Sequence, residues 1–198
     1  MSGSDDDWPV TLSGVTETVV ATRGPNGRWN HAALGVHAGD PPTATTWGNT
    51  RTRRNFEREG GGVVQFTVDP RDFVDAALSV LERDDPVLAS SDAWVRADAE
   101  RVATAERGGT RTETWELRAV ESAVEDERVP TINRGFGAVV DATVAASRLD
   151  VDAYDAAALL DRLRYFAGVV DRCGGERERE AFERIDEHVG WRERNESL

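Results

Sequence analysis

The chain has 198 residues, a formal net charge of -13 and 31% charged residues, and every Lys/Arg cation is arginine because no lysine occurs in the sequence. An acidic surface repels phosphate backbones, and no lysine patch is present to release counterions, so we expect no nucleic-acid partner. Acidic excess without lysine is typical of proteins adapted to molar salt, where the Debye length falls to roughly 3 Å. We therefore expect a halophilic protein. A merely acidic mesophilic protein is the alternative.

The lack of a recognisable targeting signal and the single cysteine further restrict the class of protein. No apolar run approaches the roughly 18 residues that a membrane span requires. The start of the chain carries Asp5, Asp6 and Asp7 without a cation, unlike the basic start of a signal peptide, so we expect a cytoplasmic protein without a membrane partner. Cys173 is the only cysteine, which excludes an internal disulfide and favours a small buried or helix-end residue over a reactive thiol.

The first half of the chain has the pattern of short strands. After an acidic tail over residues 1–12, expected to be disordered, β-branched and alternating segments predict strands at residues 15–22, 31–37 and 43–47. An arginine-rich helix is predicted near 52–59, capped by Gly60, Gly61 and Gly62, and a nearly continuous apolar strand follows at 63–68.

A helix start is clearly marked after this strand. Asp69 is a good N-cap and Pro70 suits the first helical position, and apolar residues then recur at helical spacing to about Leu81. Two longer strands are predicted near 93–107 and 112–125, joined at Gly108 and Gly109.

From Asn133 the apolar period changes to that of a helix. Three stripes predict three helices: Phe136, Val139, Val140, Thr143, Val144 and Ser147; Leu159, Leu163, Phe166, Ala167 and Val170; Phe182, Ile185 and Val189. The pattern predicts an α+β fold, a small antiparallel barrel that carries helices. We expect a barrel domain over residues 13–130, a helical subdomain over 131–190 and a tail over 191–198.

The sequence contains little that indicates a hydrolase active site or a metal site. The three histidines, His31, His37 and His188, are not accompanied by a G-x-S-x-G motif, which makes a Ser-His-Asp hydrolase a weak hypothesis. No carboxylate lies at ligand spacing with His31 and His37, so no metal site is expected. Carboxylates are too abundant for any two to be singled out as an acid and base, and the catalytic residues stay unknown.

The segment 47–55 concentrates arginines, threonine hydroxyls and amides at a predicted strand-to-helix junction. Free N–H groups at a helix start bind phosphate, and arginine adds a bidentate donor. The alternative is a surface helix in which Arg53 pairs with Glu57 and Thr52 only caps the helix. A second polar helix start, Asn133 and Arg134, either closes over a ligand or is a capping asparagine beside a solvated arginine.

Five segments occur in an order that matches a known family. They are Glu17 to Thr22, Asn30 to Val36, Thr52 to Phe56, Val63 to Pro70 and Ile132 to Val139. Together they resemble the archaeal domain-of-unknown-function family numbered 447, over about residues 15 to 188. The family is similar to FMN-binding split barrels, relatives of pyridoxamine-phosphate oxidases and flavin reductases.

The resemblance implies a six-stranded antiparallel barrel, a homodimer, and FMN held in a cleft at the dimer interface. It implies that Thr50, Arg51, Thr52 and Asn55 hold the flavin phosphate. It also implies that Asn30, His31 and Ala32 run beside the isoalloxazine ring. Asn133 and Arg134 are counted among the candidate cofactor contacts on the functional interpretation of their helix start. This chain departs from the family at Ala33, where members usually carry proline, and at Gln65, where a longer amide replaces asparagine near the flavin.

Three functions are compatible with these features. The first is an FMN-dependent oxidoreductase with a small-molecule electron donor or acceptor, such as NAD(P)H, in which the flavin carries the electrons. The second is a non-catalytic FMN-binding module that acts as a carrier, sensor or assembly factor. The third is a step in archaeal pterin or one-carbon cofactor metabolism. The sequence does not name the substrate.

Overall fold

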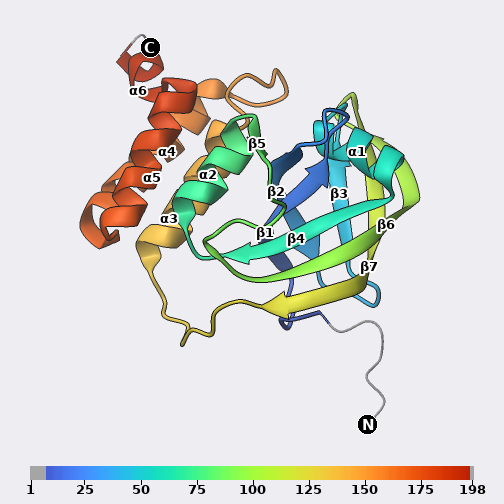
Figure 1. The fold of residues 1–198 in the computed structure, drawn as a ribbon. Helices are drawn as coiled ribbons and strands as arrows, with labels where there is room; N and C mark the ends of the chain where they lie inside the picture. Colours follow the sequence, from blue (N-terminus) through green and yellow to red (C-terminus); the bar gives the residue numbers. More distant parts are fainter. Residues whose placement is uncertain (1–7, 197–198) are drawn as a thin grey trace. The chain divides into compact units, whose positions relative to one another are not determined.

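The structure, a computed structural model, describes residues 8–196 and divides the chain into two compact units (Figure 1). Unit 1 contains the chain up to Val68 together with Val80–Arg128, and unit 2 contains Asp69–Ser79 and the chain from Val129 onward. Within the described residues, none of the helices combines the length and apolar character needed to cross a membrane. The units are described separately.

Unit 1 is a closed antiparallel barrel. Its six strands are β1 (Val15–Arg23), β2 (Trp29–His37), β3 (Thr43–Trp47), β4 (Gly61–Thr67), β6 (Ser91–Arg107) and β7 (Thr110–Val124). They are hydrogen-bonded in the order β1-β4-β6-β7-β3-β2, and β2 pairs with β1 to close the ring. The predicted six-stranded antiparallel barrel is confirmed, and the strand bounds shift by only a few residues.

A seventh strand, β5 (Leu81–Arg83), was not predicted from the sequence. One edge of β2 pairs with β1 along its whole length, so β3 and β5 share the other edge. β3 pairs with Val36 and His37, whereas β5 pairs with the opposite end of β2, residues 29–31. Three residues are too few to show an alternating pattern, so the sequence pattern extended the preceding helix into this segment.

The barrel interior holds one apolar cluster that includes Val20, Val64, Val95 and Leu117. Helix α1 (Arg51–Glu59) adds Phe56, whose ring lies 5.3 Å from that of Trp115, so α1 covers one end of the barrel. Trp115 is oriented by its indole Nε1, which donates to Thr46 Oγ1 at 2.9 Å.

Glycines allow α1 to end against the barrel. Gly60 ends the helix with a φ of 75°, a conformation that favours glycine. Gly61 already belongs to β4, and a Cβ atom there would clash with the carbonyl oxygen of Ala97 on β6. The glycine run, predicted as a helix cap, therefore also allows the close approach of β4 and β6.

Residues 8–12 lie against the barrel, although the sequence placed them in a disordered tail. The ring of Trp8 is 6.3 Å from that of Phe66, and Trp8 and Leu12 both pack against the interior cluster. The acidic residues 1–7 lie outside the described part of the chain.

Unit 2 is helical. It comprises α2 (Pro70–Leu78), α3 (Arg134–Ala146), α4 (Ala156–Cys173), α5 (Glu176–Val189) and α6 (Trp191–Glu196). The domain boundaries expected from the sequence place α2 in the barrel domain. In the structure α2 packs against α3 and α5, and its Val74 lies in their apolar core. The predicted tail contains α6, where Trp191 packs 5.9 Å from Phe182.

The buried face of α3 differs from the predicted stripe. The helical period is as expected, but the most buried side belongs largely to small residues, including Gly135, Ala138 and Ala142. Phe136 is only half-buried. A Cβ atom at Gly135 would lie 2.5 Å from the Cα of Gly174, the residue that follows α4, so close packing of backbones decides which face is buried.

Candidate functional site

The amino terminus of α1 has the features of an anion site. Thr50 caps the helix, and its Oγ1 accepts the backbone N–H of Arg53 at 3.3 Å. The cap is therefore Thr50, and Thr52 lies buried inside the first turn. The N–H groups of Arg51 and Thr52 are the first two of the helix and have no intrahelical acceptor, so they are suited to an anion.

Arg51 is held by a carboxylate on β5. Its Nη1 donates to Oε1 of Glu82 at 2.7 Å, while the Arg51 side chain keeps 47% of its surface exposed. The second oxygen of Glu82, Oε2, accepts from Nδ2 of Asn26 at 3.2 Å. Asn26 lies in the turn between β1 and β2, and its Oδ1 accepts the N–H of Arg28 at 3.1 Å. A chain of polar contacts thus joins this turn, β5 and α1.

Asn55 fastens α1 to β1. The buried amide donates through Nδ2 to Thr22 Oγ1 at 2.9 Å, and its Oδ1 accepts from Nη2 of Arg58 at 2.9 Å. Both ends of the amide are engaged inside the protein. Asn55 therefore braces the helix start and does not point a free group toward a ligand.

The predicted contacts on β2 do not share one face. Register pairs Asn30 with Thr22 on β1 and with Glu82 on β5, which brings Asn30 close to the α1 site. Side chains alternate along a strand, so Asn30 and Ala32 lie on the interior face with the barrel core, and His31 lies on the opposite face. His31 is 1% exposed.

His31 and Gln65 together hold the loop before β6. Gln65 Oε1 accepts the N–H of Leu88 at 2.6 Å, and its Nε2 lies 3.4 Å from His31 Nδ1. His31 Nε2 is 3.2 Å from the carbonyl of Asp85. This arrangement fits a histidine whose Nδ1 accepts from Gln65 and whose Nε2 donates to Asp85. The longer amide at position 65 thus has a structural partner in the loop.

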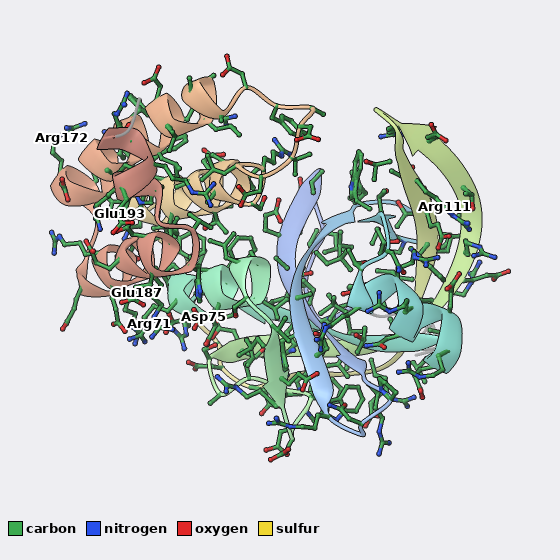
Figure 2. All side chains as sticks on the ribbon, turned by 90° about the horizontal axis from the view of Figure 1, so that it is seen from above. Arg71, Asp75, Arg111, Arg172, Glu187 and Glu193 are labelled. Carbon is green, nitrogen blue, oxygen red and sulfur yellow. The ribbon has the colours of Figure 1, made fainter. Side chains whose placement is uncertain are left out.

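A second group of charges lies beside the α1 site. Glu113 on β7 is fully buried, and its Oε1 is shared by three guanidiniums: Arg53 at 3.3 Å, Arg101 at 3.5 Å and Arg111 at 2.5 Å. Figure 2 labels Arg111 on the β6–β7 hairpin. Arg53 also pairs with Glu57 at 3.3 Å, as the surface-helix alternative predicted. Arg53 is therefore held by the barrel and is not a solvated side chain.

The helix start in unit 2 fits a capping role. Asn133 caps α3, and its Oδ1 accepts the N–H groups of Gly135 at 2.8 Å and Phe136 at 3.4 Å. Arg134 is exposed. The assignment of Asn133 and Arg134 as cofactor contacts stays a prediction. Across residues 8–196, no group of three or more His, Cys, Asp or Glu side chains could hold a metal ion.

Sequence reasoning missed Glu82 and Asn26. Glu82 lies in the unpredicted strand β5, in a segment rich in other carboxylates, and Asn26 has the features of an ordinary turn residue. No local signal distinguished either of them. Both matter only because the barrel brings them to α1.

The barrel and its helical unit define the class of the protein: a split β-barrel with an appended helical unit. The same fold occurs in an FMN-bound protein from Methanosarcina mazei of the DUF447 family, with a TM-score of 0.78 at 23% identity over 90% of this chain and 96% of that chain. The chain belongs to this family: "Protein of unknown function (DUF447) N-terminal domain" matches residues 16–126, and "Protein of unknown function (DUF447)" matches residues 133–187.

Two further solved structures are more distant. The styrene monooxygenase flavin reductase of Pseudomonas putida S12 has a TM-score of 0.43 at 12% identity, over 59% of this chain and 93% of its own. Flavoredoxin from Methanosarcina acetivorans has a TM-score of 0.43 at 13% identity, over 66% and 79% of the two chains. Both scores are too low to support a conclusion about this chain.

Proposed function

We propose that this protein binds FMN and that the flavin phosphate binds at the amino terminus of α1. The observation that carries the proposal is Arg51, which a contact to Glu82 holds at the helix start while 47% of its side-chain surface stays exposed. The residues present fit a phosphate. Two backbone N–H groups without an intrahelical acceptor, a guanidinium and the helix dipole all attract a dianion. The FMN bound to the family member from Methanosarcina mazei supports the choice of ligand.

The other residues of the site have supporting roles in this proposal. Thr50 and Thr52 shape the first turn, and Asn55 fixes that turn to β1 through Thr22. We also propose that Asn30, His31 and Ala32 on β2 lie beside the flavin ring, where the strand pairing of Asn30 with Glu82 connects them to the phosphate site. We also propose Asn133 and Arg134 as cofactor contacts.

We propose further that the protein is an FMN-dependent oxidoreductase with a small-molecule electron donor or acceptor. Bound FMN supplies electron transfer, and the protein supplies binding, orientation and electrostatics. The test is the absorbance spectrum of protein purified in molar KCl, recorded before and after anaerobic addition of NADPH. Flavin absorbance that bleaches and returns over many turnovers on exposure to air supports the oxidoreductase. A flavin spectrum that no nicotinamide changes favours the non-catalytic module.

Binding itself is tested by titrating the apo-protein with FMN and with riboflavin. The proposal requires FMN to bind more tightly, because riboflavin lacks the phosphate. Equal affinity for the two flavins would contradict the phosphate site at α1.

We also propose that the protein is a cytoplasmic homodimer. The nearly continuous apolar strand predicted at residues 63–68 does not need a second subunit to cover it, because Val63, Val64 and Gln65 are buried within the single chain. The homodimer is the assembly that the family resemblance implies, and Trp47 and Val102 on the barrel are 48% and 47% exposed. Light scattering in molar KCl should give the mass of a dimer. A stable monomer that retains FMN would contradict it.

A further inference from the structure

We infer that Glu82 is a positioning residue for Arg51 and that it increases the preference of this site for a phosphorylated flavin over riboflavin. The inference rests on the proposed function, since it concerns the same phosphate site. Glu82 does not need to touch the ligand. It acts through the guanidinium that does.

The geometry shows a carboxylate with both oxygens in use. Oε1 of Glu82 binds Nη1 of Arg51 at 2.7 Å, and Oε2 binds Nδ2 of Asn26 at 3.2 Å. The Glu82 side chain is 22% exposed, and strand pairing with Asn30 on β2 fixes its backbone. The anchor is therefore more rigid than the group it holds, because the Arg51 side chain is 47% exposed.

One contact to Glu82 leaves most of the guanidinium available. A guanidinium has five N–H donors in a planar fork, so a single nitrogen bound to Glu82 leaves other donors for a phosphate. A long side chain that is already held loses less conformational freedom when it binds a ligand. Ordering one such side chain weakens binding by about fivefold, and Glu82 removes most of that loss.

The negative charge of Glu82 has the opposite tendency, because it repels a phosphate dianion. Two considerations limit this repulsion. The positive guanidinium bonds directly to Glu82 and offsets its charge, and molar salt weakens the remaining repulsion because the Debye length falls to about 3 Å. In high salt the positioning effect therefore exceeds the repulsion.

The experiment measures the affinity of apo-protein for FMN and riboflavin in molar KCl, by flavin fluorescence. Glu82→Ala should weaken FMN binding by about fivefold and leave riboflavin binding unchanged. The same substitution in an Arg51→Ala background should cause no further loss, because no guanidinium remains to be positioned. Glu82→Gln, which keeps an acceptor oxygen for Arg51, should recover most of the affinity.

The matched control is Glu59→Ala. It breaks a 2.7 Å salt bridge to Arg58 at the other end of the same helix, and it should leave the affinities for both flavins unchanged. If Glu82→Ala proves poorly folded by thermal unfolding, Asn26→Ala replaces it. That variant keeps the contact between Arg51 and Glu82, removes the second support of the carboxylate, and should weaken FMN binding selectively by a smaller factor.

Each of the following outcomes would overturn the inference. Tighter FMN binding by Glu82→Ala would identify Glu82 as a competitor of the phosphate. Equal losses for FMN and riboflavin, or losses that add to those of Arg51→Ala, would indicate a merely structural role. If the wild type binds FMN and Glu82→Ala binds it equally well, the positioning role is rejected and the proposed function stands. Absence of FMN binding by the wild type would reject both.

Discussion

Arg51 and Arg53 lie two positions apart on α1 and have different environments. Arg51 contacts Glu82 through one nitrogen and is half exposed, whereas Arg53 contacts Asn49, Glu57 and the buried Glu113. A substitution of Arg51 therefore removes the proposed phosphate contact, and a substitution of Arg53 disturbs the barrel. This difference decides which arginine can test the phosphate site.

We predict that Arg51→Ala weakens FMN binding by about tenfold to a hundredfold, because a charge-assisted hydrogen bond contributes roughly 1.5–3 kcal/mol. Riboflavin binding should be nearly unchanged. Fluorescence titration of the apo-protein measures both affinities. Arg162→Ala, at an exposed position on α4, makes the same change in net charge and serves as the control. FMN affinity equal in the wild type and Arg51→Ala would show that the phosphate binds elsewhere.

Glu113 is the centre of a structural charge cluster. Its carboxylate is fully buried, its Oε1 contacts three arginines, and its Oε2 has no hydrogen-bond partner. Loss of the Glu113 charge leaves the partly buried Arg53 with Glu57 as its remaining carboxylate partner. We expect Glu113→Gln to lower the free energy of unfolding by about 3 kcal/mol, the lower end for breaking a buried pair.

Urea denaturation in molar KCl measures the effect of Glu113→Gln. The control is Glu116→Gln on the same strand, which breaks a more exposed pair with Arg118 and should cost less than about 1 kcal/mol. Equal effects of the two substitutions would show that burial of Glu113 does not strengthen its ion pairs.

At the scale of an element, the start of α2 joins two helices of unit 2. Asp69 caps α2 and accepts from Arg71 through both oxygens, at 2.9 Å and 2.6 Å. Arg71 also donates to Glu180 on α5 at 2.8 Å. The hydrogen bonds from Arg71 hold the pKa of Asp69 below its ordinary value, and those from Arg71 and Arg184 do the same for the pKa of Glu180. Figure 2 labels Arg71 among these helices.

The lowered pKa of Asp69 predicts a pH-dependent contribution to stability. A carboxyl group whose folded-state pKa is depressed stabilises the fold above its unfolded pKa of about 3.9, and this contribution is lost as the pH falls through the folded value. Asp69→Asn keeps a good N-cap and removes only the charge. We expect Asp69→Asn to be less stable than the wild type at pH 7 and to approach it as the pH falls below about 4.

Chemical denaturation at a series of pH values measures this difference. In an Arg71→Ala background the effect of Asp69→Asn on the free energy of unfolding should depend much less on pH, because the largest cause of the lowered Asp69 pKa is gone. A constant difference between the wild type and Asp69→Asn at every pH would contradict the assignment.

At the scale of the whole molecule, net charge governs the response to salt. A chain with a net charge of -13 repels itself, and the Debye length decreases from about 10 Å at 0.1 M salt to about 3 Å at 1 M. We expect the melting temperature to rise with KCl over this interval and bound flavin to be released at the low end. Circular dichroism and flavin fluorescence measure the two changes.

Sucrose at matched osmolality separates screening from the general effect of excluded cosolvents. It should raise the melting temperature less than KCl does. A melting temperature that is the same in low and molar salt would contradict a halophilic protein.

The sequence by itself determined most elements of the fold. Residues Asp69 and Pro70 marked the start of α2, alternation marked the strand around Trp115 and Leu117, and helical spacing marked α4 and α5. These signals are local, because caps and periodicity depend on residues only a few positions apart. The same local chemistry marked the segment 47–55 as suited to phosphate, and the family resemblance selected Thr50 and Arg51 within it.

Only the tertiary structure decided which residues act together. Strand β5 is too short to have a pattern, and its pairing with β2 brings Glu82 to Arg51 across 31 positions of sequence. The buried face of α3 depends on a backbone that approaches Gly135, and the contacts of Gln65 depend on the loop at Leu88. Barrel closure and helix packing create such contacts between distant segments, and no periodicity within one segment encodes them.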